Sequence, residues 1–465
     1  MTRFSQPISL LTLSLLTITI SISASAQYTE IVSFNGNSAA GPRTPLTQGA
    51  DGNLYGTTRY GGTGTCFDGS GVGCGVVFRI ADGKMSVIYN FQQTGPYYPA
   101  NDLVLGSDLN FYGTTVNGNG AIFKIAPDGT FTTLYTFSGG SGGYAPQGGV
   151  IQATDGNFYG TTAAGGAPST FCPSGCGTVF KMTPAGVLTT LYSFCPQNYC
   201  PDGENPAGPL VQGVDGTFYG TTLTGGLFKA GTVFQITSKG TFKLLYTFNP
   251  PDPYTGGLIL ATDGNFYGTT FYFVYRISPA GVFTELTGVG NGVNLPIQGN
   301  DGNLYGTTLP SGSLGLGSIF EMPISGTTST TLYDFAGYPN DGSYPQSGLV
   351  QATDGTFYGT TYAGGSSPCN YYSAGCGTVF SYDAGLGPFV ALVRGMGRVG
   401  QKFVVLGQGL TGTTSVSLNG IPATFTVKLD TALIANVPAG ASSGYVTVTT
   451  PTGTLTSNAP FYVLP

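Results

Sequence analysis

One short motif recurs along this chain and constrains its fold more than any other feature. The stretch DGNFYGTT at 155–162 has close copies through most of the sequence. The seven copies begin at Asp51, Asp108, Asp155, Asp215, Asp263, Asp301 and Asp354. Their intervals of 38 to 60 residues are typical of propeller and solenoid repeats.

Each copy fits into a unit of four short strands. In the third unit, GVIQAT (149–154) and NFYGTT (157–162) flank an Asp-Gly hairpin, and GTVFKM (177–182) and VLTTLYSF (187–194) flank the turn TPAG. Phe158 and Tyr159 point to opposite faces of their strand, so both faces of the sheet need cover. Four antiparallel strands covered on both faces match one blade of a propeller. A ring of seven carboxylates or calcium sites is the alternative interpretation of the Asp residues, although Asp-Gly is an ordinary hairpin choice.

A segment near the N-terminus resembles the fourth strand of a unit but precedes the first unit. YTEIVSFNG at 28–36 matches FTTLYTFSG at 131–139. We therefore expect it to pair in the seventh unit and close the ring, which removes a sheet edge. The predicted fold class is all-β, a seven-bladed β-propeller over residues 27–387 closed by the N-terminal strand.

The repeats, with DGxFYGTTxxGG followed by GTVFKI and LYTF, resemble the GloVer tandem-repeat family of extracytoplasmic bacterial proteins over about residues 28–386. The resemblance implies a propeller similar to the NHL type and no established activity. Virginiamycin B lyase has a similar unit, but its catalytic His has no counterpart because this chain contains no His. The period ends near Pro388, and KFVVLGQGL, SVSLNG, ATFTV, ALIANVP and YVTVTT then alternate as in a small sandwich. Residues 388–465 resemble an IPT/TIG immunoglobulin-like domain, a module used as a spacer or binding unit.

The N-terminus and the charge indicate where the protein works. Residues 1–26 combine an early Arg3, an apolar run and small residues at Ala24 and Ala26, which is typical of a secretory signal peptide. A membrane anchor is the weaker interpretation, because the run is interrupted by Ser and Thr. We expect a secreted or extracytoplasmic protein without membrane insertion. The formal net charge of -6 also disfavours nucleic acid as a partner.

The eight cysteines form four close pairs in the sequence. An even count, short spacings and a signal peptide favour disulfides. The predicted pairs are Cys66 with Cys74, Cys172 with Cys176, Cys195 with Cys200, and Cys369 with Cys376. A metal site is the competing interpretation, most of all at CPSGC (172–176), but zinc sites need four nearby Cys or His ligands. We expect neither a metal nor a cofactor.

The predicted binding surface lies on one face. The hairpins are short, whereas the connections at the other ends of the strands are long, varied and hold all four cysteine pairs, so they are the place for a site. The candidate ligand-binding residues are Tyr97, Tyr98, Tyr144, Tyr199, Asp202, Glu204, Tyr254, Tyr338, Asp341, Tyr344, Tyr371 and Tyr372. Their rings could stack on a sugar or peptide, and their carboxylates could accept hydrogen bonds. The competing interpretation is that Tyr and Pro pack these loops together.

Three functions remain open. The first is a non-catalytic scaffold that binds an extracellular glycan or protein. The second is a carboxylate-dependent glycosidase or lyase at the channel, which needs two carboxylates about 5 to 10 Å apart. Asp102, Asp202, Glu204, Asp252 and Asp341 are scattered over different units, and the chain has neither His nor a free Cys as base or nucleophile, so we favour binding over catalysis. The third is a structural surface or matrix protein.

Overall fold

The structure is a computed structural model that describes residues 27–66, 73–206, 208–250, 256–286, 288–326, 328–369 and 373–465. The predicted signal peptide lies outside these residues, as do Tyr254, Tyr371 and Tyr372. Within the described ranges the fold is all-β, apart from one short 3-10 turn, η1 (Gly140–Gly142). In the same ranges, no helix is long and apolar enough to cross a membrane.

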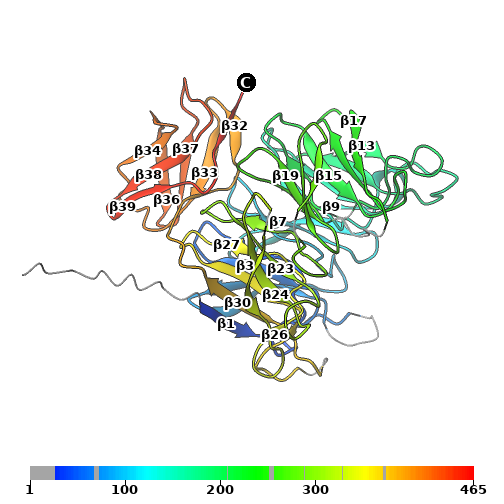
Figure 1. The fold of residues 1–465 in the computed structure, drawn as a ribbon, viewed down its shortest axis with the longest axis horizontal. Coiled ribbons are helices and arrows are strands. Elements are labelled where there is room, and N and C mark those ends of the chain that lie inside the picture. The colour runs from blue at the N-terminus through cyan, green and yellow to red at the C-terminus, as the bar shows by residue number, and fades with distance from the viewer. Residues whose placement is uncertain are drawn as a thin grey trace, which may run out of the picture.

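Residues 27–383 form seven four-stranded antiparallel sheets within the described ranges, one for each copy of the motif (Figure 1). We number the sheets in the order of their motifs. Sheet 1 contains β2 (Thr47–Gln48), β3 (Leu54–Thr58), β4 (Val76–Ala81) and β5 (Lys84–Asn90). Sheet 2 contains β6 (Val104–Leu105), β7 (Phe111–Thr115), β8 (Ala121–Ile125) and β9 (Phe131–Thr136). Sheet 3 contains β10 (Val150–Gln152), β11 (Phe158–Thr162), β12 (Thr178–Met182) and β13 (Leu188–Ser193).

The remaining sheets repeat this order. Sheet 4 contains β14 (Val211–Gln212), β15 (Phe218–Thr222), β16 (Thr232–Ile236) and β17 (Phe242–Thr247). Sheet 5 contains β18 (Leu258–Leu260), β19 (Phe266–Thr269), β20 (Val274–Ile277) and β21 (Phe283–Glu285). Sheet 6 contains β22 (Ile297–Gln298), β23 (Leu304–Thr308), β24 (Ser318–Met322) and β25 (Thr330–Asp334). Sheet 7 contains β27 (Val350–Gln351), β28 (Phe357–Thr361), β30 (Thr378–Asp383) and β1 (Gln27–Ser33). A small extra ladder joins β26 (Gly342–Ser343) to β29 (Ala363–Gly364).

The recurring motif forms the first hairpin of every sheet and locks it. In sheet 3, Gly156 turns the chain at a φ of 82°. Asp155 then accepts hydrogen bonds from the Asn157 backbone N–H at 3.0 Å, the Tyr159 hydroxyl at 2.9 Å and the Lys181 ammonium at 3.1 Å. All seven sheets repeat the Asp–Tyr bond, at 2.7 to 3.3 Å. The seven carboxylates are therefore engaged within their own hairpins.

Both faces of the second strand are buried, as its sequence predicted. All five residues of β11 are buried. The Tyr159 ring stacks on Phe218 of sheet 4 at 4.0 Å, so the aromatic residues of the motif fill the space between sheets. Gly160 permits the close packing on its strand, because a Cβ there would lie 2.5 Å from the Gly149 carbonyl oxygen.

The N-terminal strand joins the two ends of the repeat array. β1 pairs antiparallel with β30 from Gln27↔Asp383 to Ser33↔Thr378, as predicted. Gln48 of sheet 1 also bonds to Thr353 of sheet 7, accepting from its N–H at 3.0 Å and donating to its hydroxyl at 3.2 Å. Sheets 1 and 7 therefore meet through both a strand pairing and a side-chain bridge.

The C-terminal region forms a separate pair of sheets, coloured orange and red in Figure 1. One sheet has the order β31 (Ala391–Leu392), β33 (Lys402–Leu406), β37 (Ala432–Asn436) and β36 (Phe425–Leu429). The other has the order β35 (Ile421–Pro422), β34 (Ser415–Leu418), β38 (Val446–Thr450) and β39 (Gly453–Thr456). A parallel pair, β32 (Met396–Arg398) and β40 (Tyr462–Leu464), lies beside them. We call residues 388–465 the C-terminal module; each of its five predicted strands is present.

The C-terminal module packs against the hairpin face, the side on which the Asp-Gly turns lie. The Thr431 hydroxyl donates to the Ala50 carbonyl at 2.7 Å, and the Arg394 guanidinium donates to the Ala153 carbonyl at 3.0 Å. Val404 and Leu406 share an apolar cluster with sheets 1 and 2, while Phe403 and Val405 enter the core of the module itself. Strand β33 is therefore apolar on both faces because it contacts two different cores.

Candidate functional site

The long connections gather on the face opposite the hairpins, which we call the loop face. In an antiparallel four-stranded sheet, the connection between the second and third strands and the connection to the next sheet leave from the same end. All eight cysteines lie in these connections and form the four predicted disulfides, with Cα–Cα distances of 4.2 to 5.6 Å. Four disulfides are typical of an extracellular protein.

Four large apolar side chains are exposed on the loop face, in the long connections of sheets 3 and 4. Their exposed fractions are 46% for Phe171, 68% for Tyr199, 77% for Leu227 and 47% for Phe228. The rings of Phe171 and Tyr199 lie 4.7 Å apart. The Gly226 N–H donates to the Cys200 carbonyl at 2.8 Å, which brings the loop of Leu227 beside Tyr199. We call these four residues the apolar patch.

The predicted tyrosines divide into two groups. Tyr199 and Tyr338 are strongly exposed on the loop face. Tyr97, Tyr98, Tyr144 and Tyr344 are half-buried. Tyr97 and Tyr98 pack on the cluster between sheets 1 and 2, and Tyr144 packs on the cluster between sheets 2 and 3. For these three residues the structure supports the alternative that tyrosines pack the loops together.

Two predicted carboxylates hold their own loops instead of facing solvent. Asp341 is only 4% exposed and accepts hydrogen bonds from the Tyr333 hydroxyl at 2.8 Å and the Ala336 N–H at 2.7 Å. Asp202 repeats the arrangement, accepting from the Tyr192 hydroxyl at 2.8 Å and the Cys195 N–H at 3.0 Å. We correct the expectation for Asp341, because its carboxylate is buried and used within the chain.

The environments of Asp202 and Glu204 differ. Burial raises the pKa of Asp202, and the hydrogen bonds from Tyr192 and Cys195 oppose that rise. Glu204 is half-buried, and its Oε2 lies 3.4 Å from Cys176 Sγ. The two residues are close in sequence, yet each is committed to a different contact on the loop face.

A cavity of about 870 Å³ lies where the first strands of the sheets converge. Its wall contains apolar residues from these strands, namely Val104, Val150, Ile151, Val211, Ile259, Ile297 and Val350. Gly395, Met396, Asn458, Ala459, Pro460 and Tyr462 of the C-terminal module also line it. Because the module packs on the hairpin face, it covers the cavity at that end.

Asp102 is the single carboxylate among the described residues that line this cavity. Burial raises its pKa to about 6, and a hydrogen bond from its own backbone N–H limits this rise. The equivalent position in other sheets holds Pro45, Gly149, Pro209, Gly257, Leu295 and Gly348. A second carboxylate, which acid and base catalysis on a glycoside requires, is not among the described residues of this wall.

Phe171, Leu227 and Phe228 were not among the predicted ligand-binding residues. Each sits in a connection between second and third strands that carries no repeated motif. A large apolar side chain in a Gly-rich loop was the available signal, but such residues are as often buried as exposed. The tertiary arrangement of the loops decides that these side chains are exposed.

The comparisons with known proteins agree with the repeat pattern. The profile of the Gloeobacter/Verrucomicrobia repeat matches residues 63–276 and 272–411. The chain belongs to this repeat family. The second match extends beyond the last hairpin motif into the C-terminal module. No curated protein matches the sequence.

Solved structures similar to this repeat protein have propeller-like folds. The extracellular domain of a protein assigned as a hybrid two-component system of B. thetaiotaomicron is 12% identical, with a TM-score of 0.50. The match covers 94% of this chain and 57% of that one. A gluconolactonase from Xanthomonas campestris is 15% identical, with a TM-score of 0.39, over 60% of this chain and 86% of that one. At these identities the likeness concerns the fold.

Proposed function

We propose that this repeat protein is a secreted, non-catalytic scaffold that binds another protein through its loop face. In this proposal the seven sheets are the blades of a closed seven-bladed propeller, and the C-terminal module is an IPT/TIG-like domain. The pairing of β1 with β30 and the bridge between Gln48 and Thr353 support a closed ring.

The observation that carries the proposal is the apolar patch. Monomeric proteins rarely expose several large apolar side chains side by side unless the surface is an interaction site. The rings of Phe171 and Tyr199 are in contact, and each residue is next in sequence to a disulfide cysteine. Leu227 and Phe228 are exposed in the loop that Gly226 joins to Cys200 by a hydrogen bond. Restrained loops lose less conformational entropy on binding. An apolar patch of this kind favours a protein partner over a glycan, whose hydroxyls need more hydrogen-bonding groups.

The test is cross-linking in the bacterium that produces the protein. A photo-cross-linking residue replaces Asn198, which is exposed next to Tyr199, or Val187, which is exposed on the hairpin face. We expect a specific protein adduct from position 198 and none from position 187. With the trapped protein purified, the triple variant Phe171→Ser, Leu227→Ser, Phe228→Ser should bind it at least about 10-fold more weakly.

The matched control replaces two exposed valines on the hairpin face, Val187→Ser and Val282→Ser, and should leave the dissociation constant unchanged. Saturable binding of a glycan that survives the triple variant would contradict the proposal and favour a sugar ligand. An adduct between two copies of this chain at position 198 would instead favour a structural role.

A further inference from the structure

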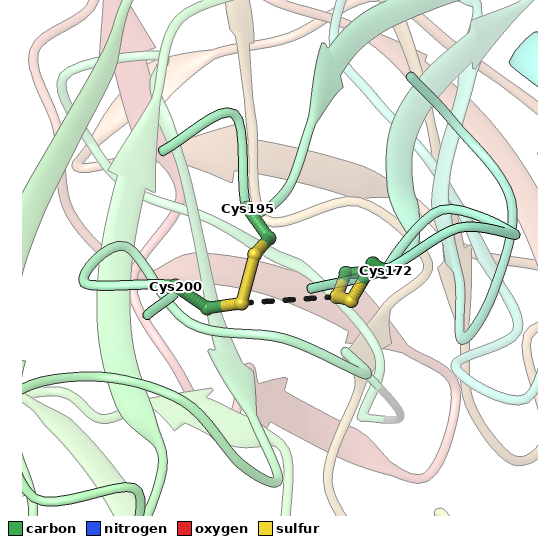
Figure 2. Close-up of side chains that lie close together, drawn as sticks. Cys172, Cys195 and Cys200 are labelled. Carbon is green, nitrogen blue, oxygen red and sulfur yellow. Dashed lines mark hydrogen bonds between the residues drawn. A yellow bond between two sulfur atoms is a disulfide. The ribbon is translucent and has the colours of Figure 1, made fainter. Parts of the chain in front are cut away.

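Two of the four disulfides lie against one another on the loop face. The Sγ atoms of Cys172, Cys176, Cys195 and Cys200 all lie within 4.8 Å of one another. Figure 2 shows Cys195 and Cys200 facing Cys172 across this cluster, and the contact between Cys176 Sγ and Cys200 Sγ is 3.9 Å. Among the described residues, no other group of three or more metal-ligating side chains comes this close.

The strand pairing of sheet 3 explains why the four sulfurs meet. Cys176 stands two residues before β12, and Cys195 stands two residues after β13. Thr178 pairs with Ser193, so the two cysteines emerge at the same end of one hairpin. In sheet 1 the strands β4 and β5 place Cys74 and Gln92 at these positions, so the disulfide of Cys66 and Cys74 has no second pair beside it.

The dimensions of the cluster suit a tetrahedral ion. Zinc bound by four thiolates has metal–sulfur distances of about 2.3 Å, which places the sulfurs about 3.8 Å apart. Cys176 Sγ and Cys200 Sγ, which belong to different pairs, already lie 3.9 Å apart. The two sulfurs of each disulfide must move apart by side-chain rotation once the bond is reduced. Cys176, Cys195 and Cys200 are each at most 4% exposed, and Cys172 is half-buried, so water is largely kept away.

The charge beside the cluster also favours a cation. Glu204 Oε2 lies 3.4 Å from Cys176 Sγ and 3.8 Å from Cys172 Sγ. A carboxylate at this distance attracts a divalent ion and can stabilise it from outside the ligand set. The side chains of other residues that hydrogen-bond to the sulfurs among the described residues are those of Ser169 and Glu204, and neither is cationic.

We propose that Cys172, Cys176, Cys195 and Cys200 form a site for Zn²⁺ or another thiophilic divalent cation when their thiols are reduced, as they are when the chain is synthesised. Four thiols lose their protons as the ion binds, and no oxidant or reductant takes part in that step. Metal binding and formation of the two disulfides are then alternative ways to hold the same loops. The proposal is independent of the binding function of the apolar patch.

The test uses the full mature chain, reduced with a phosphine under anaerobic conditions and titrated with Co²⁺. We expect one Co²⁺ per chain with the absorption bands of a tetrahedral cobalt thiolate, and displacement by Zn²⁺. The variant Cys195→Ser, Cys200→Ser should lose these bands and bind about 100-fold more weakly. The matched variant Cys66→Ser, Cys74→Ser removes an isolated pair and should keep them. Glu204→Gln should weaken binding about 10-fold.

A second measurement needs no variant. The reduced chain is treated with an alkylating reagent with and without Zn²⁺, and each cysteine is followed by mass spectrometry. Protection confined to Cys172, Cys176, Cys195 and Cys200 supports the site. Absence of the cobalt thiolate bands in the reduced wild-type chain, or equal protection of all eight cysteines, would overturn it.

Discussion

At the scale of single residues, side-chain hydrogen bonds that the sequence does not reveal stabilise the repeat motif. The Asp and Tyr of DGxxY are four positions apart, and the hairpin turns the Tyr hydroxyl back onto the Asp carboxylate. Asp202 and Asp341 use the same chemistry in the long loops, each holding a Tyr from the preceding outer strand. Aspartates that looked like candidate ligands or catalysts therefore serve largely as internal acceptors.

Asp102 is the exception, and it gives a prediction on pH. Its pKa rises to about 6 in the folded chain, against an ordinary value of 3.8. Above pH 6 the carboxylate is charged in both states, and its burial lowers the stability of the fold. Between pH 6 and pH 4 only the folded chain binds the proton, so this penalty disappears as the pH falls.

We expect Asp102→Asn to raise the free energy of unfolding by about 1–3 kcal/mol at pH 7.5 and by almost nothing at pH 4. Urea unfolding at the two pH values measures the difference. Asp128→Asn is the control, because Asp128 is exposed and hydrogen bonds from Thr130 lower its pKa. Asp128→Asn should instead lower the free energy of unfolding at pH 7.5. Equal gains for Asp102→Asn at both pH values would exclude ionisation as the cause.

At the scale of elements, β1 is the strand that joins the two ends of the repeat array. It belongs to sheet 7 although it precedes sheet 1 in the chain, so it connects the ends of the repeat array. Its Tyr28 ring stacks on Tyr333 of sheet 6 at 4.0 Å, with the rings 9° from parallel. The strand therefore holds sheet 7 to both of its neighbours.

We expect Tyr28→Ala to lower the free energy of unfolding by about 3 kcal/mol, the range for a large aromatic side chain removed from a packed site. The measurement is urea unfolding of the mature chain. Tyr445→Ala, which removes an exposed Tyr of the C-terminal module, should cost less than about 0.5 kcal/mol. Similar losses in the two variants would mean that β1 does not secure the ends of the repeat array.

At the scale of the whole molecule, the C-terminal module and the sheets form one packed unit. The module covers one end of the cavity and shares an apolar cluster with sheets 1 and 2. The loop face, with the disulfides and the apolar patch, remains open on the other side. The C-terminal module therefore covers the hairpin face and leaves the loop face uncovered.

The alternation along β33 predicts how to separate the two parts. Val404 and Leu406 contact the sheets, whereas Phe403 and Val405 fill the core of the module. We expect Val404→Asp with Leu406→Asp to release the module without unfolding it, because the new charges stay outside its core. Small-angle scattering should show a larger radius of gyration, and proteolysis should become faster near Pro388. Ile421→Asp, at an exposed site on the module, should change neither measurement. A compact double variant would contradict the interface.

The sequence by itself determined the repeat, the four-stranded units, the pairing of β1 and the four disulfides. These features follow from local rules: Asp-Gly turns, alternation along strands and short distances between cysteines. The tertiary structure alone decided the rest. It placed the module over the cavity, exposed Phe171, Leu227 and Phe228, buried Asp341 and brought two cysteine pairs into one cluster. Each of these features depends on contacts between segments of different sheets. Such segments are far apart in the sequence, so local sequence patterns do not reveal which of them meet.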